Sequence, residues 1–131
     1  MLERVVLAYD FSERCDDALA WTVDLVRALR GRVHLVHVAS VRSDDDPALN
    51  DLRRELAAVA DEAGAEVLSH VLVGDDVAKA LVSHADDVNA DALVIATRAT
   101  RGVARWLLGS VADEIIASAH CPVITLREHE D

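Results

Sequence analysis

The sequence predicts an α/β protein built on a single open sheet of five mostly parallel strands, with helices on both faces. Two observations lead to this prediction. Five apolar segments rich in branched residues alternate along the chain with four segments of helical periodicity, which is the pattern of parallel strands joined by crossover helices. Apolar residues make up 52% of the chain and aromatic residues only 3%, so the core is expected to consist of aliphatic side chains.

The length and charge of the chain restrict the classes of function. Its 131 residues suit one domain that covers residues 1–131. No apolar segment approaches the roughly 20 residues that span a bilayer, and the charged N-terminus does not resemble a signal peptide. We therefore expect a cytoplasmic protein with no membrane partner. The net charge of −11 repels polyanions and disfavours nucleic acid as a partner.

The first strand is predicted at 5–10, where "VVLAYD" is largely apolar, as in a strand buried on both faces. The next segment places apolar residues at helical spacing. Ser12 is positioned to cap the start of this helix, and Gly31 follows its end. A second strand is predicted at 32–40.

The second helix is predicted to start at Asp46 and Pro47, with the aspartate as cap and the proline as the first helical residue. Gly64 is expected to stop this helix. The segment 65–74 alternates apolar and polar residues, which predicts a third strand near the edge of the sheet.

The last part of the chain repeats the pattern. A helix is predicted within 75–89, followed by a strand at 90–97. Ser110 is expected to cap a final helix that runs to about residue 118. The fifth strand, 121–126, is short and has a proline near its start, as an edge strand tolerates.

Ligands of such sheets bind beyond the carboxyl ends of the strands, where the strand order reverses. The predicted order is 3-2-1-4-5, a Rossmann-like arrangement that puts this point between the first and fourth strands. It brings Asp10 next to residues 96–110, "ATRATRGVARWLLGS", which end in Gly-Ser at a helix start and so suit a phosphate. Asp10 is expected either to shape the turn through its own hydrogen bonds or to bind a ribose hydroxyl or base amine.

The remaining polar residues do not predict a catalytic group. Ser110 is not part of a G-x-S-x-G turn. The six histidines match no recognised zinc spacing, so no metal site is expected; they are His34, His37, His70, His84, His120 and His129. Cys15 and Cys121 are expected to be free thiols, with a disulfide between them as the alternative.

Three segments together resemble the universal stress protein family. They are "VVLAYDFSE" near the start, "LVHVAS" in the second strand and "GVARWLLGSVADEIIASAHCPVITLR" near the end. The resemblance covers essentially the whole chain, and the last segment is its most specific part. It implies a fold of the adenine nucleotide α-hydrolase-like class.

The resemblance also implies where a nucleotide would bind. Nucleotide-binding members carry G-x-x-G, nine further residues and then G-[ST]. Here the final pair matches Gly109 and Ser110, whereas the first two glycines are replaced by Ala96 and Ala99. Because glycines let a phosphate loop adopt positive φ and approach an anion closely, the two alanines predict weakened ATP binding. The positions that would contact a retained nucleotide are Asp10, Val38, Gly102, Gly109, Ser110 and Val111.

The resemblance therefore predicts a non-enzymatic stress-response protein that acts through protein clients, with a degenerate ATP-binding loop and no cofactor. It also implies a homodimer that pairs the C-terminal strands, Pro122 to Leu126. The alternative is a switch that binds ATP or AMP with magnesium and hydrolyses ATP slowly at most. An enzyme of the wider fold class is a third possibility, but it lacks an identifiable catalytic group.

Overall fold

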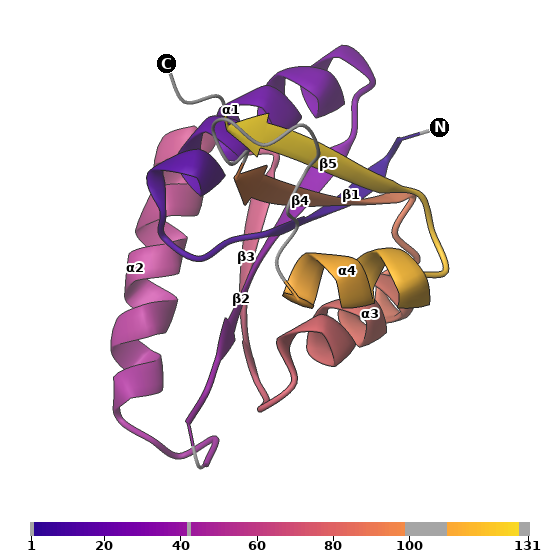
Figure 1. The fold of residues 1–131 in the computed structure, drawn as a ribbon. Helices are drawn as coiled ribbons and strands as arrows, with labels where there is room; N and C mark the ends of the chain where they lie inside the picture. The colour runs from indigo at the N-terminus through magenta and orange to yellow at the C-terminus, as the bar shows by residue number, and fades with distance from the viewer. Residues whose placement is uncertain (1, 42, 99–109, 129–131) are drawn as a thin grey trace.

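The computed structural model describes residues 2–41, 43–98 and 110–128 of the chain. Its sheet has five strands in the order β3-β2-β1-β4-β5, and all four strand pairs are parallel. The predicted topology is thus confirmed (Figure 1). The strands are β1 (Arg4–Ala8), β2 (Arg32–Ala39), β3 (Val67–Val73), β4 (Ala92–Arg98) and β5 (Val123–Glu128).

Helices cover both faces of the sheet, as Figure 1 shows. The helices α1 and α2 pack with one core cluster, and α3 and α4 pack with the other. Alternate residues of the central strands supply both clusters: Val5 and Leu7 belong to the first and Val6 to the second. The helices are α1 (Glu13–Ala28), α2 (Ala48–Ala63), α3 (Val77–Asp87) and α4 (Ser110–Ser118).

The predicted helix caps are largely present. The Ser12 side chain accepts a hydrogen bond from the Cys15 N–H group at 3.3 Å and so caps α1. Asp76, which was not among the predicted caps, caps α3 in the same way. Gly64 ends α2 with a φ of 142°, a conformation that L side chains rarely adopt.

The end of α1 differs from the prediction. The helix stops at Ala28, and Arg30 rather than Gly31 has the positive φ, 58°. Gly31 is required for another reason, because a Cβ atom there would collide with the Leu2 carbonyl oxygen at the start of the chain.

Several predicted boundaries were wrong by a few residues. Strand β1 ends at Ala8, so Asp10 lies in the turn after the strand and not at its last position. Helix α2 begins at Ala48; the Asp46 side chain still accepts a hydrogen bond from the Ala48 N–H group at 2.9 Å, but Pro47 precedes the first helical residue.

Ala96 was predicted both in the strand 90–97 and at the start of the phosphate loop 96–110, and the structure places it in the strand. Strand β4 continues to Arg98, and Ala96 is paired in register with Leu126 of β5. Within the described part of the chain, the non-glycine residues with positive φ are Phe11, Arg30 and Asn89. Ala96 therefore has an ordinary extended backbone, which an alanine adopts without strain.

Across the described segments, the structure holds no helix with the length and apolar character needed to cross a membrane.

Candidate functional site

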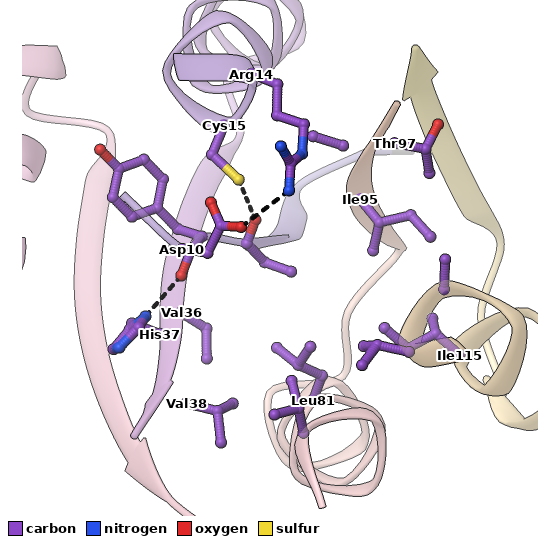
Figure 2. Close-up of a pocket in the computed structure, with 16 residues that line it drawn as sticks. Asp10, Arg14, Cys15, Val36, His37, Val38, Leu81, Ile95, Thr97 and Ile115 are labelled. Carbon is purple, nitrogen blue, oxygen red and sulfur yellow. Dashed lines mark hydrogen bonds and ion pairs between the residues drawn. The ribbon is translucent and has the colours of Figure 1, made fainter. Parts of the chain in front are cut away.

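A cavity of about 550 Å³ opens at the carboxyl ends of β1 and β4, the position where the strand order reverses. Its volume is within the range of small-molecule sites. Figure 2 shows the side chains of β2 and α3 on one side of the cavity and those of β4 and α4 on the other. The apolar walls include Val36, Val38, Val77, Leu81, Ile95, Ala112 and Ile115.

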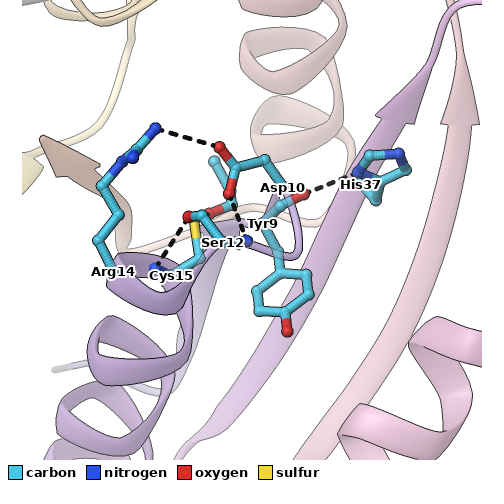
Figure 3. Close-up of polar contacts among 7 residues, drawn as sticks. Tyr9, Asp10, Ser12, Arg14, Cys15 and His37 are labelled. Atoms are coloured by element: carbon cyan, nitrogen blue, oxygen red, sulfur yellow. Dashed lines mark hydrogen bonds and ion pairs between the residues drawn. The ribbon is translucent and has the colours of Figure 1, made fainter.

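The turn after β1 forms the polar border of this cavity (Figure 3). Asp10 Oδ1 accepts a hydrogen bond from the Ser12 N–H group at 2.9 Å, which folds the chain back toward α1. Between them, Phe11 has a φ of 64°, an uncommon conformation for a bulky residue. Edge-to-face contacts hold its ring, with centroid distances of 5.1 Å to Tyr9 and 5.0 Å to His37.

The Asp10 carboxylate is ionised and has a cation beside it. Desolvation acts to raise the pKa of Asp10, but the polar contacts of the carboxylate with Cys15 and Ser12 and the charge of Arg14 outweigh it, so the pKa lies below its ordinary value. The Arg14 Nη2 atom lies 3.4 Å from Asp10 Oδ2. Because both side chains are partly exposed, this ion pair is weak and free to rearrange around a ligand.

The thiol and the imidazole nearest to Asp10 are both engaged in hydrogen bonds. Cys15 Sγ donates to the Ala8 carbonyl oxygen at 3.7 Å, and burial raises the pKa of this thiol to about 11. His37 Nδ1 lies 2.8 Å from the Tyr9 carbonyl oxygen. Since a carbonyl only accepts, Nδ1 carries a proton and donates. Cys15 is therefore a protonated thiol and a poor nucleophile.

Thr97 adds an unsatisfied polar atom to the cavity wall. Its side chain is 5% exposed, and its hydroxyl has no hydrogen-bond partner among the described residues. Buried hydroxyl groups are rarely left unpaired. A ligand atom that entered the cavity and hydrogen-bonded to this hydroxyl would remove the deficit.

The predicted nucleotide-binding residues have different outcomes. Asp10, Val38 and Val111 all line the cavity, and so does Ala96. Ser110 begins α4, is exposed and is not part of the lining. The other predicted positions, Ala99, Gly102 and Gly109, lie outside the described residues.

Sequence reasoning missed Arg14, Cys15, His37 and Thr97, which also border the cavity. Arg14 is four residues after Asp10, so both side chains fall on the same side of the helix start; this spacing could have indicated the pair. It also missed that His34, His70 and His84 come together on the sheet. They belong to β2, β3 and α3, so no local spacing could have shown it.

Comparisons with known proteins identify a family and related structures with the same fold. Residues 1–127 match the model of the universal stress protein family. A universal stress protein of Methanocaldococcus jannaschii is 24% identical, over 98% of this chain and 84% of that protein. The structure of a universal stress protein from Archaeoglobus fulgidus is 27% identical and covers 94% of this chain and 92% of its own, with a TM-score of 0.76. An A. fulgidus universal stress protein in complex with dAMP is also 27% identical, with coverages of 95% and 98% and a TM-score of 0.74. The family whose model matches is the one that the sequence resembles, and this chain belongs to the universal stress protein family.

Proposed function

We propose that this domain is a non-enzymatic, homodimeric stress-response protein whose cavity binds an adenine nucleotide with a short phosphate chain, of the AMP class, in preference to ATP. The observation that carries the proposal is the cavity itself. It combines apolar walls with an ionised carboxylate and a cation at the strand-order reversal of the sheet.

The walls suit a purine base. Aliphatic side chains from β2, α3, β4 and α4 face each other across the cavity (Figure 2), and a flat heterocycle is stabilised by burial between such surfaces. Val38 lies on this wall at the position that the family resemblance assigns to the nucleotide.

The polar border suits a ribose and one phosphate. The Asp10 carboxylate accepts hydrogen bonds and can take those of ribose hydroxyl groups. Arg14 Nη2 is already at the border and supplies a positive charge for a phosphate. The start of α4 at Ser110 adds the positive end of a helix dipole. The A. fulgidus relative in complex with dAMP supports a ligand of this class.

The preference for a short phosphate chain rests on charge. Among the described residues that line the cavity, Arg14 is the one arginine or lysine, and the whole chain carries a net charge of −11. A triphosphate brings more negative charge into this field than a monophosphate does. Replacement of the motif glycine by Ala99 acts in the same direction, whereas Ala96 has an extended backbone and adds no strain.

A binding role fits the chemistry of the site better than catalysis. The thiol of Cys15 is protonated at neutral pH because of its raised pKa and is therefore a poor nucleophile. Both described cysteines are free, which agrees with a reducing, cytoplasmic location.

The proposal is tested by calorimetry with AMP, ADP and magnesium–ATP on protein from which any nucleotide carried over from the host has been removed. We expect AMP to bind more tightly than magnesium–ATP. Tighter binding of magnesium–ATP would support the alternative, an ATP-binding switch. If none of the three nucleotides gives heat or a thermal shift, the nucleotide part of the proposal is wrong.

A further inference from the structure

We propose that His34, His70 and His84 form a binding site for a divalent transition metal ion, with Zn²⁺ as the best fit. The three rings come from β2, β3 and α3 and meet on the face of the sheet that α3 covers. None of them lines the nucleotide cavity, so this site is independent of the proposed function.

The distances are close to those of a bound metal. One ring nitrogen of each histidine lies within 4.8 Å of the others, and His34 Nδ1 is 3.0 Å from His70 Nε2. Nitrogen ligands of tetrahedral zinc are about 3.3 Å apart, given a Zn–N distance of about 2.0–2.1 Å. Small rotations of the rings would therefore bring the three nitrogens to coordination distance.

The rings already have little freedom. The centroids of His34 and His70 are 5.2 Å apart with nearly parallel planes, and those of His70 and His84 are 4.9 Å apart. Two of the three residues are on paired strands, where the backbone is rigid. A site on such elements loses less conformational entropy when the metal binds than a site on loops.

The hydrogen bonding of the cluster is incomplete without a metal. The contact between His34 Nδ1 and His70 Nε2 is a single hydrogen bond, in which one nitrogen carries the proton and the other accepts it. His84 Nε2 is buried and has no hydrogen-bond partner among the described residues. A metal ion would accept a lone pair from each of the three rings and satisfy all of them.

The surroundings favour neutral rings. Burial is the main cause that lowers the pKa of each of the three imidazoles, and a neutral imidazole is the form that binds metal. Arg4 and Arg32 are the cations near His34, and Asp87 is the anion near His84. The two arginines are exposed, so solvent screens their repulsion of a metal ion.

Three imidazoles select the class of metal. Mg²⁺ and Ca²⁺ prefer oxygen ligands, whereas imidazole suits zinc, copper, nickel and cobalt. Among the described residues, no fourth protein ligand joins the three histidines, so the fourth position of a tetrahedron falls to water or an exogenous ligand.

Metal titrations of the full chain, after treatment with a chelator, test the proposal. We expect one Zn²⁺ per chain with a Kd on the order of 1 μM, four-coordinate absorption bands with Co²⁺, and no effect of Mg²⁺. His34→Gln, His70→Gln and His84→Gln should each weaken zinc binding by at least about 100-fold, since loss of an outer partner alone costs about 10–100-fold. His120→Gln is the matched control, because this exposed histidine pairs with Asp86 outside the cluster.

A second measurement does not depend on variants that could misfold. In the ¹⁵N-labelled wild-type protein, zinc should shift one ring nitrogen in each of His34, His70 and His84. Zinc that binds only above about 1 mM, or shifts at His120 in place of the cluster, would overturn the proposal. Equal losses of affinity in His120→Gln and the cluster variants would do the same.

Discussion

The Asp10 carboxylate has two partners before any ligand binds, the Ser12 N–H group and the Arg14 guanidinium. Asp10→Asn keeps an oxygen for the Ser12 contact and removes the charge. We expect AMP affinity to fall by about 10- to 100-fold, since a hydrogen bond to a charged group contributes about 1.5–3 kcal/mol. Calorimetry measures this. Asp17→Asn removes the same charge from an exposed position on α1 and should leave the AMP affinity unchanged. If both variants lost the same affinity, the net charge of the protein, and not a contact of Asp10 with AMP, would be the cause.

Variants of Arg14 should separate the contribution of the phosphate to AMP binding from that of the nucleoside. Its guanidinium is the cation among the described residues that line the cavity, so Arg14→Gln is expected to lower AMP affinity by about 10-fold, an effect of about 1.4 kcal/mol. The affinity for adenosine should not change. Arg14→Lys retains the charge and should restore most of the AMP affinity. If adenosine binding falls as much as AMP binding, Arg14 shapes the cavity and does not contact phosphate.

At the scale of the elements, Ala96 tests how the motif positions act. Because β4 is extended at this residue and paired with β5, Ala96→Gly should not raise ATP affinity through backbone freedom. It should instead lower the free energy of unfolding by about 0.5–1 kcal/mol, the cost of glycine inside a strand. Urea unfolding and ATP calorimetry measure the two effects. A tenfold or larger gain in ATP affinity from Ala96→Gly alone would mean that residue 96 leaves the strand conformation when ATP binds, which would contradict this account.

Asp91 connects the starts of two strands. Its Oδ2 atom accepts hydrogen bonds from the backbone N–H groups of Glu3 and Arg4 at 2.9 and 3.0 Å, and these bonds lower the pKa of the carboxyl group. Asp91→Asn should lower the free energy of unfolding by about 1 kcal/mol near pH 7, a value reduced for partial exposure.

The effect of Asp91 should depend on pH. The folded pKa lies below the unfolded value of about 3.9, so the stabilisation is complete above that pH and is lost as the pH falls through the folded pKa. Urea unfolding between pH 7 and pH 3 should show the wild type approach the Asp91→Asn variant only at the acid end. Asp61→Asn, on the exposed side of α2, is the control. A constant difference across this range would show that the charge is not involved.

The elements also show what the sequence could predict. Local signals were sufficient where a side chain acts on its own turn, as Ser12 does at the start of α1. The end of β4 was predicted to within one residue, at 97 against Arg98. What the local sequence could not show is that Ala96, which was also placed in the predicted phosphate loop, stays paired with Leu126 of β5. Asp10 could be predicted as a site residue because it directly follows a buried strand. Thr97 could not, because its place in the cavity depends on which side of β4 faces the cavity.

For the whole molecule, the topology was predictable and the long-range contacts were not. Alternating strands and helices fix a parallel sheet, and the general rule for such sheets located the cavity. The histidine cluster required the register between β2 and β3, since 36 residues separate His34 from His70. Register follows from packing of the entire sheet and cannot be read from a short motif.

The proposed dimer is a property of the whole molecule that the edge of the sheet makes testable. Strand β5 is an edge of the sheet, and the helix that precedes it in the chain, α4, exposes Val111 by 40% and Ile116 by 47%. The edge of a sheet can pair with a strand of a second copy, and exposed apolar side chains are stabilised when a second copy covers them. Sedimentation velocity at micromolar concentration should therefore show a dimer.

Thr125 provides the sharpest test of the dimer, because it is exposed on β5. A twofold axis brings the same surface of both copies together, so Thr125→Glu places two carboxylates at one interface, where like charges repel. We expect the dissociation constant of the dimer to rise by at least about tenfold, which corresponds to about 1.4 kcal/mol. Thr125→Ser should leave it intact, and so should Leu68→Glu, which puts the same charge on the opposite edge strand, β3. A monomeric wild type would refute the dimer, and dissociation by Leu68→Glu but not by Thr125→Glu would move the interface to the β3 edge.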